Sequence, residues 1–143
     1  MNADLIDRYV EFWQALSADR LDSLSDFMTQ DIHFSDPFND LRGLAAVRET
    51  FSSLYAKIHD VDVTVHDKAI STASSAPTVC YLRWTFAFSL KSGRRMSIEG
   101  VSEVHLEPDG RASVHIDHWD AAGQMYEKFP LIGPVLRAIR KRI

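Results

Sequence analysis

The apolar positions of the first 58 residues recur at helical spacing. Between Ala3 and Leu16, large apolar side chains return every three or four residues, which predicts an amphipathic helix with an unusually aromatic face. A short helix is predicted from Asp19 to Met28, and the clearest helix from Gly43 to Ile58. Between these two, Ile32 to Asp36 indicates a short strand, which Pro37 ends because proline cannot donate to a sheet ladder.

Beyond Ile58 the pattern changes from helical to alternating, which is typical of half-buried strands. Strands are predicted at Val61 to Val65, Thr78 to Leu90, Arg95 to Glu107 and Arg111 to Trp119, with a Ser/Ala/Pro linker from Ser71 to Pro77 and a strong turn at Pro108-Asp109-Gly110. Helices followed by a meander of strands predict an α+β fold. Because long strands twist and curl, the helices are expected to close the concave side of the sheet around an apolar cavity.

The C-terminal region predicts two further helical segments. The first follows Asp120 and ends at Phe129, before Pro130. The second is expected to begin at Gly133-Pro134. Together with the residues before it, it forms the segment 130–143, which is predicted to be a basic amphipathic C-terminal helix. Its apolar stripe is Leu131, Ile132, Val135, Leu136, Ile139 and Ile143, and its basic side is Arg137, Arg140, Lys141 and Arg142. Such a helix can lie on an anionic membrane surface, but packing on the protein itself is the favoured interpretation.

Composition and charge narrow the class of protein. The 143 residues suit one domain, 1–143, and the single cysteine excludes an internal disulfide. The polar N-terminus lacks the features of a signal peptide and no long apolar run is present, so a cytoplasmic protein is expected. From Glu127 to Ile143, five Lys or Arg stand against one acid, a balance of +4. The net charge of −4 for the whole chain then leaves −8 for the rest, which argues against nucleic acid as a partner.

The segment from His115 to Asp120 holds the densest group of chemically active residues. Because alternate side chains of a strand point to opposite faces, His115, Asp117 and Trp119 should share one face and offer a base, an acid and an aromatic wall. The alternative is an outward polar edge with one buried tryptophan. Asp36 closes the strand on the same face as Ile32 and Phe34, where it serves either as an acid/base group or as a cap for the turn that follows.

Other common sites are not indicated. His115 and His118 are expected on opposite faces of one strand, so they should not share a metal ion, and no two histidines form an i,i+4 helical pair with an adjacent Glu. Glycine-rich phosphate loops and the nucleophile-elbow pattern of serine hydrolases are absent from the sequence. We therefore expect neither a metal nor a cofactor.

Two segments resemble the nuclear transport factor 2-like superfamily, which includes ketosteroid isomerases and the SnoaL-type polyketide cyclases. They are Phe34-Ser35-Asp36-Pro37-Phe38 and the helical segment from Arg42 to Phe51 with its Gly43 and Arg48, and the strand-turn-strand spacing through Gly110 agrees. The resemblance implies a cone in which N-terminal helices pack on a strongly curved antiparallel sheet, here with an extra C-terminal helix. The segments His115–Asp120, Tyr126–Lys128 and Leu131–Gly133 resemble an uncharacterised branch, which implies no particular activity.

The resemblance also implies roles for single residues, and only some of them fit. Asp36 stands where the isomerases have their general base. At their two oxyanion donors, a tyrosine and a protonated aspartic acid, this chain has Phe12 and Ser102, and Tyr9 could replace the tyrosine only if the helix were shifted. Losing one such donor typically costs ~10²–10³ in rate, so ketosteroid isomerase activity is not expected. The same alignment with the isomerases implies that His115 and Asp117 point into the cavity. Polyketide cyclases of this fold use a His and an Asp in that general region.

Three hypotheses of function follow, and the third is the association of Leu131 to Ile143 with a membrane surface. In the first, the protein is an acid/base enzyme acting on a small, largely apolar or aromatic molecule, with Asp36 as the general base and His115 and Asp117 as its partners. In the second, it is a binding module without chemistry, which holds a lipid-like or aromatic ligand in the cone or a partner on the sheet. Apolar residues such as Tyr81 and Ala87 on the other sheet face predict a homodimer. The predicted ligand-binding residues are Tyr9, Phe12, Phe34, Phe38, Trp84, Ser102 and Trp119.

Overall fold

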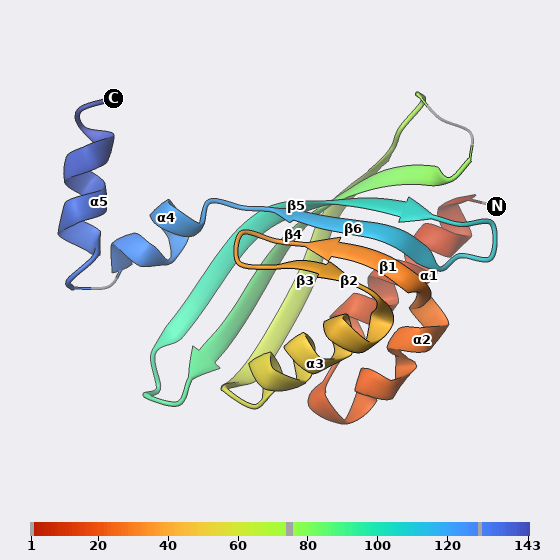
Figure 1. The fold of residues 1–143 in the computed structure, drawn as a ribbon, viewed down its shortest axis with the longest axis horizontal. Coiled ribbons are helices and arrows are strands. Elements are labelled where there is room, and N and C mark those ends of the chain that lie inside the picture. The colour runs from red at the N-terminus through yellow and green to blue at the C-terminus, as the bar shows by residue number, and fades with distance from the viewer. Residues whose placement is uncertain (1, 74–75, 129) are drawn as a thin grey trace.

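The computed structural model describes residues 2–73, 76–128 and 130–143 and folds them as helices packed against one curved sheet (Figure 1). The helices are α1 (Asn2–Ala15), η1 (Ala18–Ser23), α2 (Leu24–Phe27), α3 (Leu44–Tyr55), α4 (Ala121–Gln124), η2 (Tyr126–Lys128) and α5 (Gly133–Arg140). The strands are β1 (Met28–Ser35), β2 (Asp40–Arg42), β3 (Ile58–Ile70), β4 (Thr78–Leu90), β5 (Arg95–Leu106) and β6 (Ala112–His118). The predicted α+β class is confirmed.

Most elements lie where the apolar pattern predicts them. The strand predicted from Thr78 to Leu90 is β4, residue for residue. The second predicted helix is instead a 3-10 turn followed by one α-helical turn, and β1 begins at Met28 rather than at Ile32. Residues 74–75 of the predicted linker and Phe129, the predicted end of a helix, lie outside the described residues.

The sheet is mixed, which corrects the expectation of a wholly antiparallel one. Its strands run in the order β2-β1-β6-β5-β4-β3, and β1 pairs in parallel with β6, with Phe34 opposite His115. Two parallel neighbours end at the same edge of a sheet. The pairing therefore carries Asp36, just after β1, and Asp117, near the end of β6, to the same end of the molecule.

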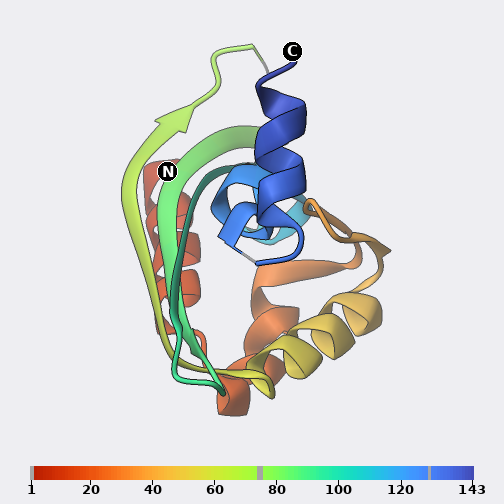
Figure 2. The same cartoon turned by 90° about the vertical axis from the view of Figure 1, so that its left-hand side faces the viewer.

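The core lies between the helices and the concave face of the sheet, whose curvature is seen in Figure 2. The helix α1 contributes Ile6 and Tyr9, both fully buried, against Ile32 and Phe34 of β1. A second apolar cluster forms near the β4–β5 turn around Ile58, Phe88, Met96 and Ile98. The outer face of the sheet exposes Tyr81 and Val101, and a homodimer through this face stays a prediction.

The C-terminal helix differs from expectation. The helix α5 stands away from the sheet, and its main neighbour is the short turn η2 rather than the core (Figure 1). The expected packing of its apolar stripe on the protein is therefore not found. Within residues 2–73, 76–128 and 130–143, each helix is too short or too polar to cross a bilayer.

Candidate functional site

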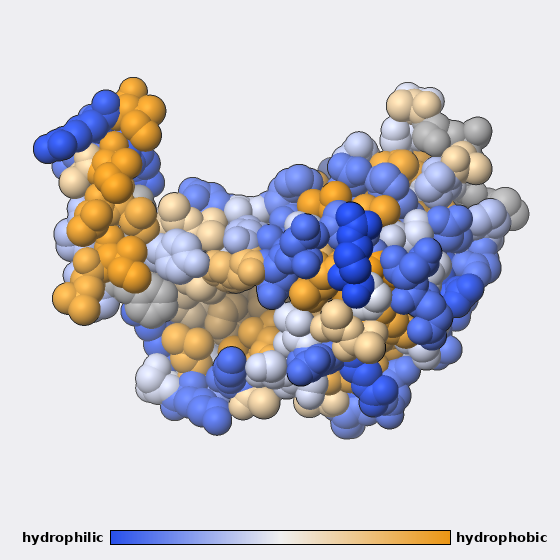
Figure 3. Space-filling view, viewed as in Figure 1, coloured by the Kyte–Doolittle hydropathy of each residue, from blue (hydrophilic) through white to orange (hydrophobic). Residues whose placement is uncertain are grey.

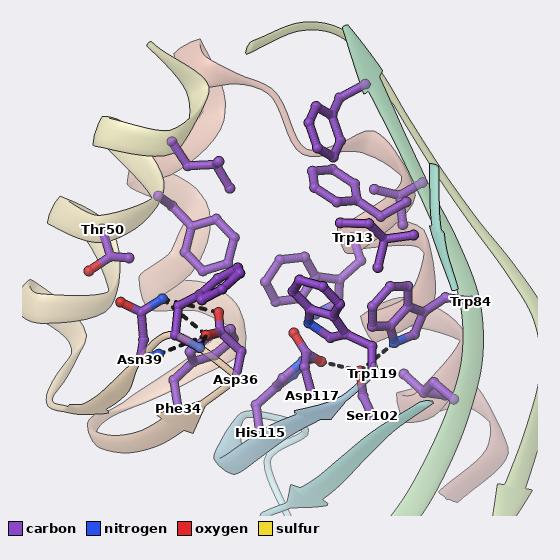
Figure 4. A pocket seen from close by; sticks show the side chains of 18 of the residues that line it. Trp13, Phe34, Asp36, Asn39, Thr50, Trp84, Ser102, His115, Asp117 and Trp119 are labelled. Carbon is purple, nitrogen blue, oxygen red and sulfur yellow. Dashed lines mark hydrogen bonds and ion pairs between the residues drawn. The ribbon is translucent and has the colours of Figure 1, made fainter. Parts of the chain in front are cut away.

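A cavity of about 210 Å³ lies on the concave side of the sheet, between β4–β6 and the helix α3 (Figure 4). Its wall is largely aromatic and aliphatic, and all three tryptophans of the chain, Trp13, Trp84 and Trp119, line it. The polar lining residues are few: Asp36, Asn39, Thr50, Tyr55, Ser102, His115 and Asp117. An apolar cavity with a few placed polar groups is the usual form of a small-molecule site.

A chain of hydrogen bonds runs along the sheet side of the cavity. The Tyr9 hydroxyl lies 2.8 Å from Nδ1 of His115, and Nε2 of His115 lies 2.8 Å from Oδ1 of Asp117. Ser102 donates its hydroxyl to the same Oδ1 at 2.5 Å, and the Trp84 indole N–H donates to Ser102 Oγ at 2.8 Å. The two ends of the chain come from α1 and β4, so four separate elements fix the Asp117 carboxylate.

The direction of these bonds follows from the Trp84 end. The indole N–H can only donate, so Ser102 gives its own hydrogen to Oδ1 of Asp117, and the carboxylate oxygen also accepts from Nε2 of His115. A neutral imidazole with its hydrogen on Nε2 accepts at Nδ1 from the Tyr9 hydroxyl, whose pKa burial raises far above its usual range. Both ring nitrogens are occupied, and Oδ1 of Asp117 accepts two bonds. The second oxygen of Asp117 takes part in none of them and faces the cavity (Figure 4).

The alternation along β6 explains the placement of both residues. His115 and Asp117 point inward, with side chains only 4% and 19% exposed, whereas His118 is exposed. The His115 ring stacks on Phe34, its neighbour on β1, at 5.1 Å between ring centres. The predicted shared face of His115, Asp117 and Trp119 is confirmed, and the interpretation of this segment as an outward polar edge is wrong.

Asp36 combines the two roles considered for it. Its Oδ1 accepts from the backbone N–H groups of Phe38 and Asn39 at 2.7 and 2.8 Å, so the carboxylate caps the turn between β1 and β2. The Asn39 side-chain amide adds contacts of 3.1 and 3.2 Å to the two carboxylate oxygens. Asp36 also lines the cavity, on a different wall from Asp117 (Figure 4).

The predicted ligand-binding residues divide into two groups. Phe34, Phe38, Trp84, Ser102 and Trp119 line the cavity. Phe12 and Tyr9 do not: Phe12 is stacked on Phe27 at 4.2 Å in the core, and Tyr9 lies behind His115, where it fixes the imidazole. The neighbour of Phe12, Trp13, faces the cavity instead, because one residue along a helix turns the side chain by about 100°.

Sequence reasoning missed the polar side of α3. Thr50 and Tyr55 both line the cavity, with Thr50 opposite the wall that carries Trp84 (Figure 4). Burial raises the pKa of Tyr55 to about 12, so its hydroxyl remains a neutral donor at physiological pH. The signal was weak, because Tyr55 fits the apolar stripe of the helix and Thr50 is an ordinary surface residue by pattern. Within the described part of the chain, no three His, Cys, Asp or Glu side chains gather as a metal site requires.

The helices on the concave face of one curved sheet have the nuclear transport factor 2-like fold, which solved NTF2-like structures share. The family model of the SnoaL-like domain matches residues 6–115 of the sequence, so the chain belongs to the SnoaL-like domain family. The match ends at His115 and leaves Asp117, Trp119 and α5 outside it. No curated protein matches the sequence.

Solved structures agree in fold at low sequence identity. An NTF2-like protein of unknown function from Exiguobacterium sp. 255-15 is 17% identical, with a TM-score of 0.68 over 81% of this chain and 98% of its own. TsrD from Streptomyces laurentii is 19% identical, with a TM-score of 0.68 over 84% and 91%. A ketosteroid isomerase-like protein from Catenulispora acidiphila DSM 44928, solved with trimethylamine, is 10% identical, with a TM-score of 0.66 over 85% and 88%.

Proposed function

We propose that this protein binds a small, largely apolar molecule in the cone cavity and moves a proton on it, with Asp117 as the acid/base group. The observation that carries the proposal is the arrangement of Asp117, whose Oδ1 is held by His115 and Ser102 while its other oxygen faces an aromatic cavity. A carboxylate fixed in this way keeps one oxygen available for proton transfer.

The size of the cavity limits the ligand. An engineered cavity of ~150 Å³ in another protein takes up benzene, and drug-sized ligands fill ~300 Å³ or more. A cavity of about 210 Å³ therefore fits a molecule of one or two rings, or a short branched acyl group. A four-ring steroid exceeds this volume, which agrees with the missing oxyanion donors at Phe12 and Ser102.

The polar groups around the cavity suggest a ligand with one oxygen. In the proposed reaction, Asp117 removes a proton from the carbon beside a carbonyl group, and the electron pair moves onto the carbonyl oxygen. Thr50 and Tyr55 line the cavity from α3, and in this proposal a hydroxyl group of theirs donates to that oxygen. His115 acts as a positioning residue, since both of its ring nitrogens are already engaged.

Asp36 is the second candidate for the base. Its Oδ1 accepts hydrogen bonds from two backbone N–H groups of the turn. Its Oδ2 has one contact, of 3.2 Å, with the side-chain amide of Asn39, so this oxygen can still accept a further hydrogen bond from the cavity. A binding module without chemistry is the alternative function. It is favoured by the same hydrogen bonds, since a fully satisfied network can also be purely structural.

Proton exchange on a bicyclic ketone separates these proposals. We would incubate the protein with 1-tetralone in D₂O and follow loss of the α-proton signal by NMR. Asp117→Asn should lower the exchange rate by at least about a hundredfold if Asp117 is the base, a typical contribution of general base catalysis. Asp36→Asn serves as the matched carboxylate control and should keep most of the activity.

Each result assigns a different role. Loss of exchange in Asp36→Asn alone would move the base to Asp36. Binding of 1-tetralone without exchange in the wild-type protein would support the binding module, and equal exchange by wild-type and both variants would contradict acid/base catalysis by these carboxylates.

A further inference from the structure

The helix α5 carries a stripe of apolar side chains that the protein itself does not cover. Leu131 is 90% exposed, and Val135 and Ile139 are 58% and 52% exposed, although all three belong to one side of an amphipathic segment. Figure 3 shows the stripe as a continuous apolar band along α5, separated from the body. Exposed large apolar groups that gather on one helix face mark an interaction surface.

The polar side of this segment has a single sign of charge. From residue 131 to the end of the chain it holds Arg137, Arg140, Lys141 and Arg142 and no acidic residue. The net charge of −4 for the whole chain leaves −8 for the remainder, so the excess of positive charge is at this end. A short apolar stripe flanked only by basic residues has the composition of a helix that lies flat at an anionic lipid interface.

Aromatic side chains continue the surface from α5 to the mouth of the cavity. Phe38 lines the cavity, is 47% exposed, and packs against Trp119 at 5.3 Å and Tyr126 at 5.7 Å between ring centres. Tyr126 belongs to η2, on which α5 rests. Tryptophan and tyrosine favour the boundary between lipid headgroups and acyl chains. The helix and the cavity rim therefore lie at one end of the molecule.

A second copy of the chain fits the α5 stripe less well. The helix α5 has eight residues and is about 12 Å long. A stable protein interface buries roughly 800 Å² on each partner, which a pair of such helices cannot supply alone. A symmetric pairing would also bring two clusters of basic residues together, which costs free energy.

We propose that residues 131–143 dock the protein on the surface of an anionic membrane. The apolar stripe enters the headgroup boundary, the basic side contacts lipid phosphates, and the cavity mouth lies beside the bilayer. The binding depends on salt because the attraction of Lys and Arg to anionic lipid is screened.

Vesicle flotation of the full chain tests this proposal. Vesicles of phosphatidylcholine with phosphatidylglycerol should carry the protein at low salt, and vesicles of phosphatidylcholine alone should carry much less. Val135→Glu with Ile139→Glu should abolish flotation, whereas Ile70→Glu, at a site on β3 that is 46% exposed, should leave it intact. Lys141→Gln with Arg142→Gln should weaken binding roughly thirtyfold, the effect of removing two cations near the membrane.

Circular dichroism and gel filtration of each variant complete the test. All the substituted side chains are exposed, so the variants should fold and elute like the parent. Absence of flotation, or flotation that Val135→Glu with Ile139→Glu leaves unchanged, would overturn the proposal. A dimer that these two substitutions dissolve, without vesicle binding, would assign the stripe to a second copy and would overturn it as well.

Discussion

Nε2 of His115 lies 2.8 Å from Oδ1 of Asp117, two residues further along the same strand. Both side chains point to the concave face, and His115 is the more deeply buried of the two. The imidazole therefore stands behind the carboxylate and orients it, with Tyr9 behind the imidazole. From the core to the cavity, the order is the Tyr9 hydroxyl, the His115 imidazole and the Asp117 carboxylate, which is the acid/base group of our proposal.

Tyr9→Phe tests the first link of this chain. The substitution keeps the ring but removes the hydroxyl, which leaves Nδ1 of the buried His115 without its donor. We expect a loss of ~1–3 kcal/mol in the free energy of unfolding, measured by urea denaturation. Tyr81→Phe, at a position that is 41% exposed, should change it by less than about 0.5 kcal/mol. Equal losses in the two variants would show that the Tyr9 hydroxyl contributes nothing specific.

Asp36→Ala tests the turn-capping role. It removes the oxygen that accepts two backbone N–H groups, and we expect a loss of about 1–2 kcal/mol in the free energy of unfolding. Asp36→Asn keeps an acceptor oxygen and should lose less than half as much. If both variants were as stable as the parent in thermal denaturation, the turn would not depend on this side chain, and a role in the cavity would be the better explanation of the carboxylate.

Gly100→Ala tests how tightly the cavity wall is packed. A Cβ at Gly100 would lie 2.7 Å from Cη2 and Cζ2 of Trp84 and 2.8 Å from the carbonyl oxygen of His118. Trp84 is held by its bond to Ser102, so it cannot move without cost. We expect a loss of ~1–3 kcal/mol and a changed tryptophan fluorescence spectrum. Ser97→Ala, exposed on the same strand, is the control, and an unchanged stability of Gly100→Ala would mean that the indole shifts freely.

The stability of the protein should fall in alkali, and Tyr55 should account for part of the fall. Its pKa is about 12 in the folded protein against a usual 10.0, so the unfolded chain loses the proton first. The stabilisation is complete below pH 10 and is lost as the pH rises to about 12, by up to ~2.7 kcal/mol. Burial raises the pKa of Tyr9 and Cys80 in the same direction, so other groups add to the loss.

Urea denaturation at a series of pH values measures this dependence. Tyr55→Phe should lose less stability than the parent between pH 9 and the alkaline limit, because it has no phenol to ionise. Tyr81→Phe should follow the parent curve. Parallel curves for the parent and Tyr55→Phe would contradict the effect of burial on this residue.

The local parts of the fold could be predicted from the sequence. Alternation placed β4 residue for residue and put His115 and Asp117 on one face, because the period of two is a property of the strand itself. The pairing of β1 with β6 could not be predicted, since it joins segments about 80 residues apart and depends on how the whole meander closes. The choice between the two roles of Asp36 also needed the geometry of the turn.

The sequence predicted the site only where a residue's place in it depends on the face of a strand to which the residue points. Phe12 and Trp13 belong to the same broad apolar face of α1, and only the rotation of the packed helix decides that Trp13 enters the cavity. The contact between Tyr9 and His115 joins residues 106 positions apart, so no local pattern indicates it. The position of α5 could not be predicted for another reason. An amphipathic helix needs an apolar partner, but its sequence does not identify that partner.

Tryptophan fluorescence measures occupancy of the cavity most directly, because every tryptophan of the chain lines it. Titration with 1-tetralone should shift the emission in a saturable way. Val63→Phe, which fills the cavity from β3, should abolish the shift, and Val79→Phe, half-buried on β4 but outside the cavity, should keep it. No saturable shift with 1-tetralone or other one- or two-ring ketones, or the same shift in both variants, would contradict a ligand site in the cone.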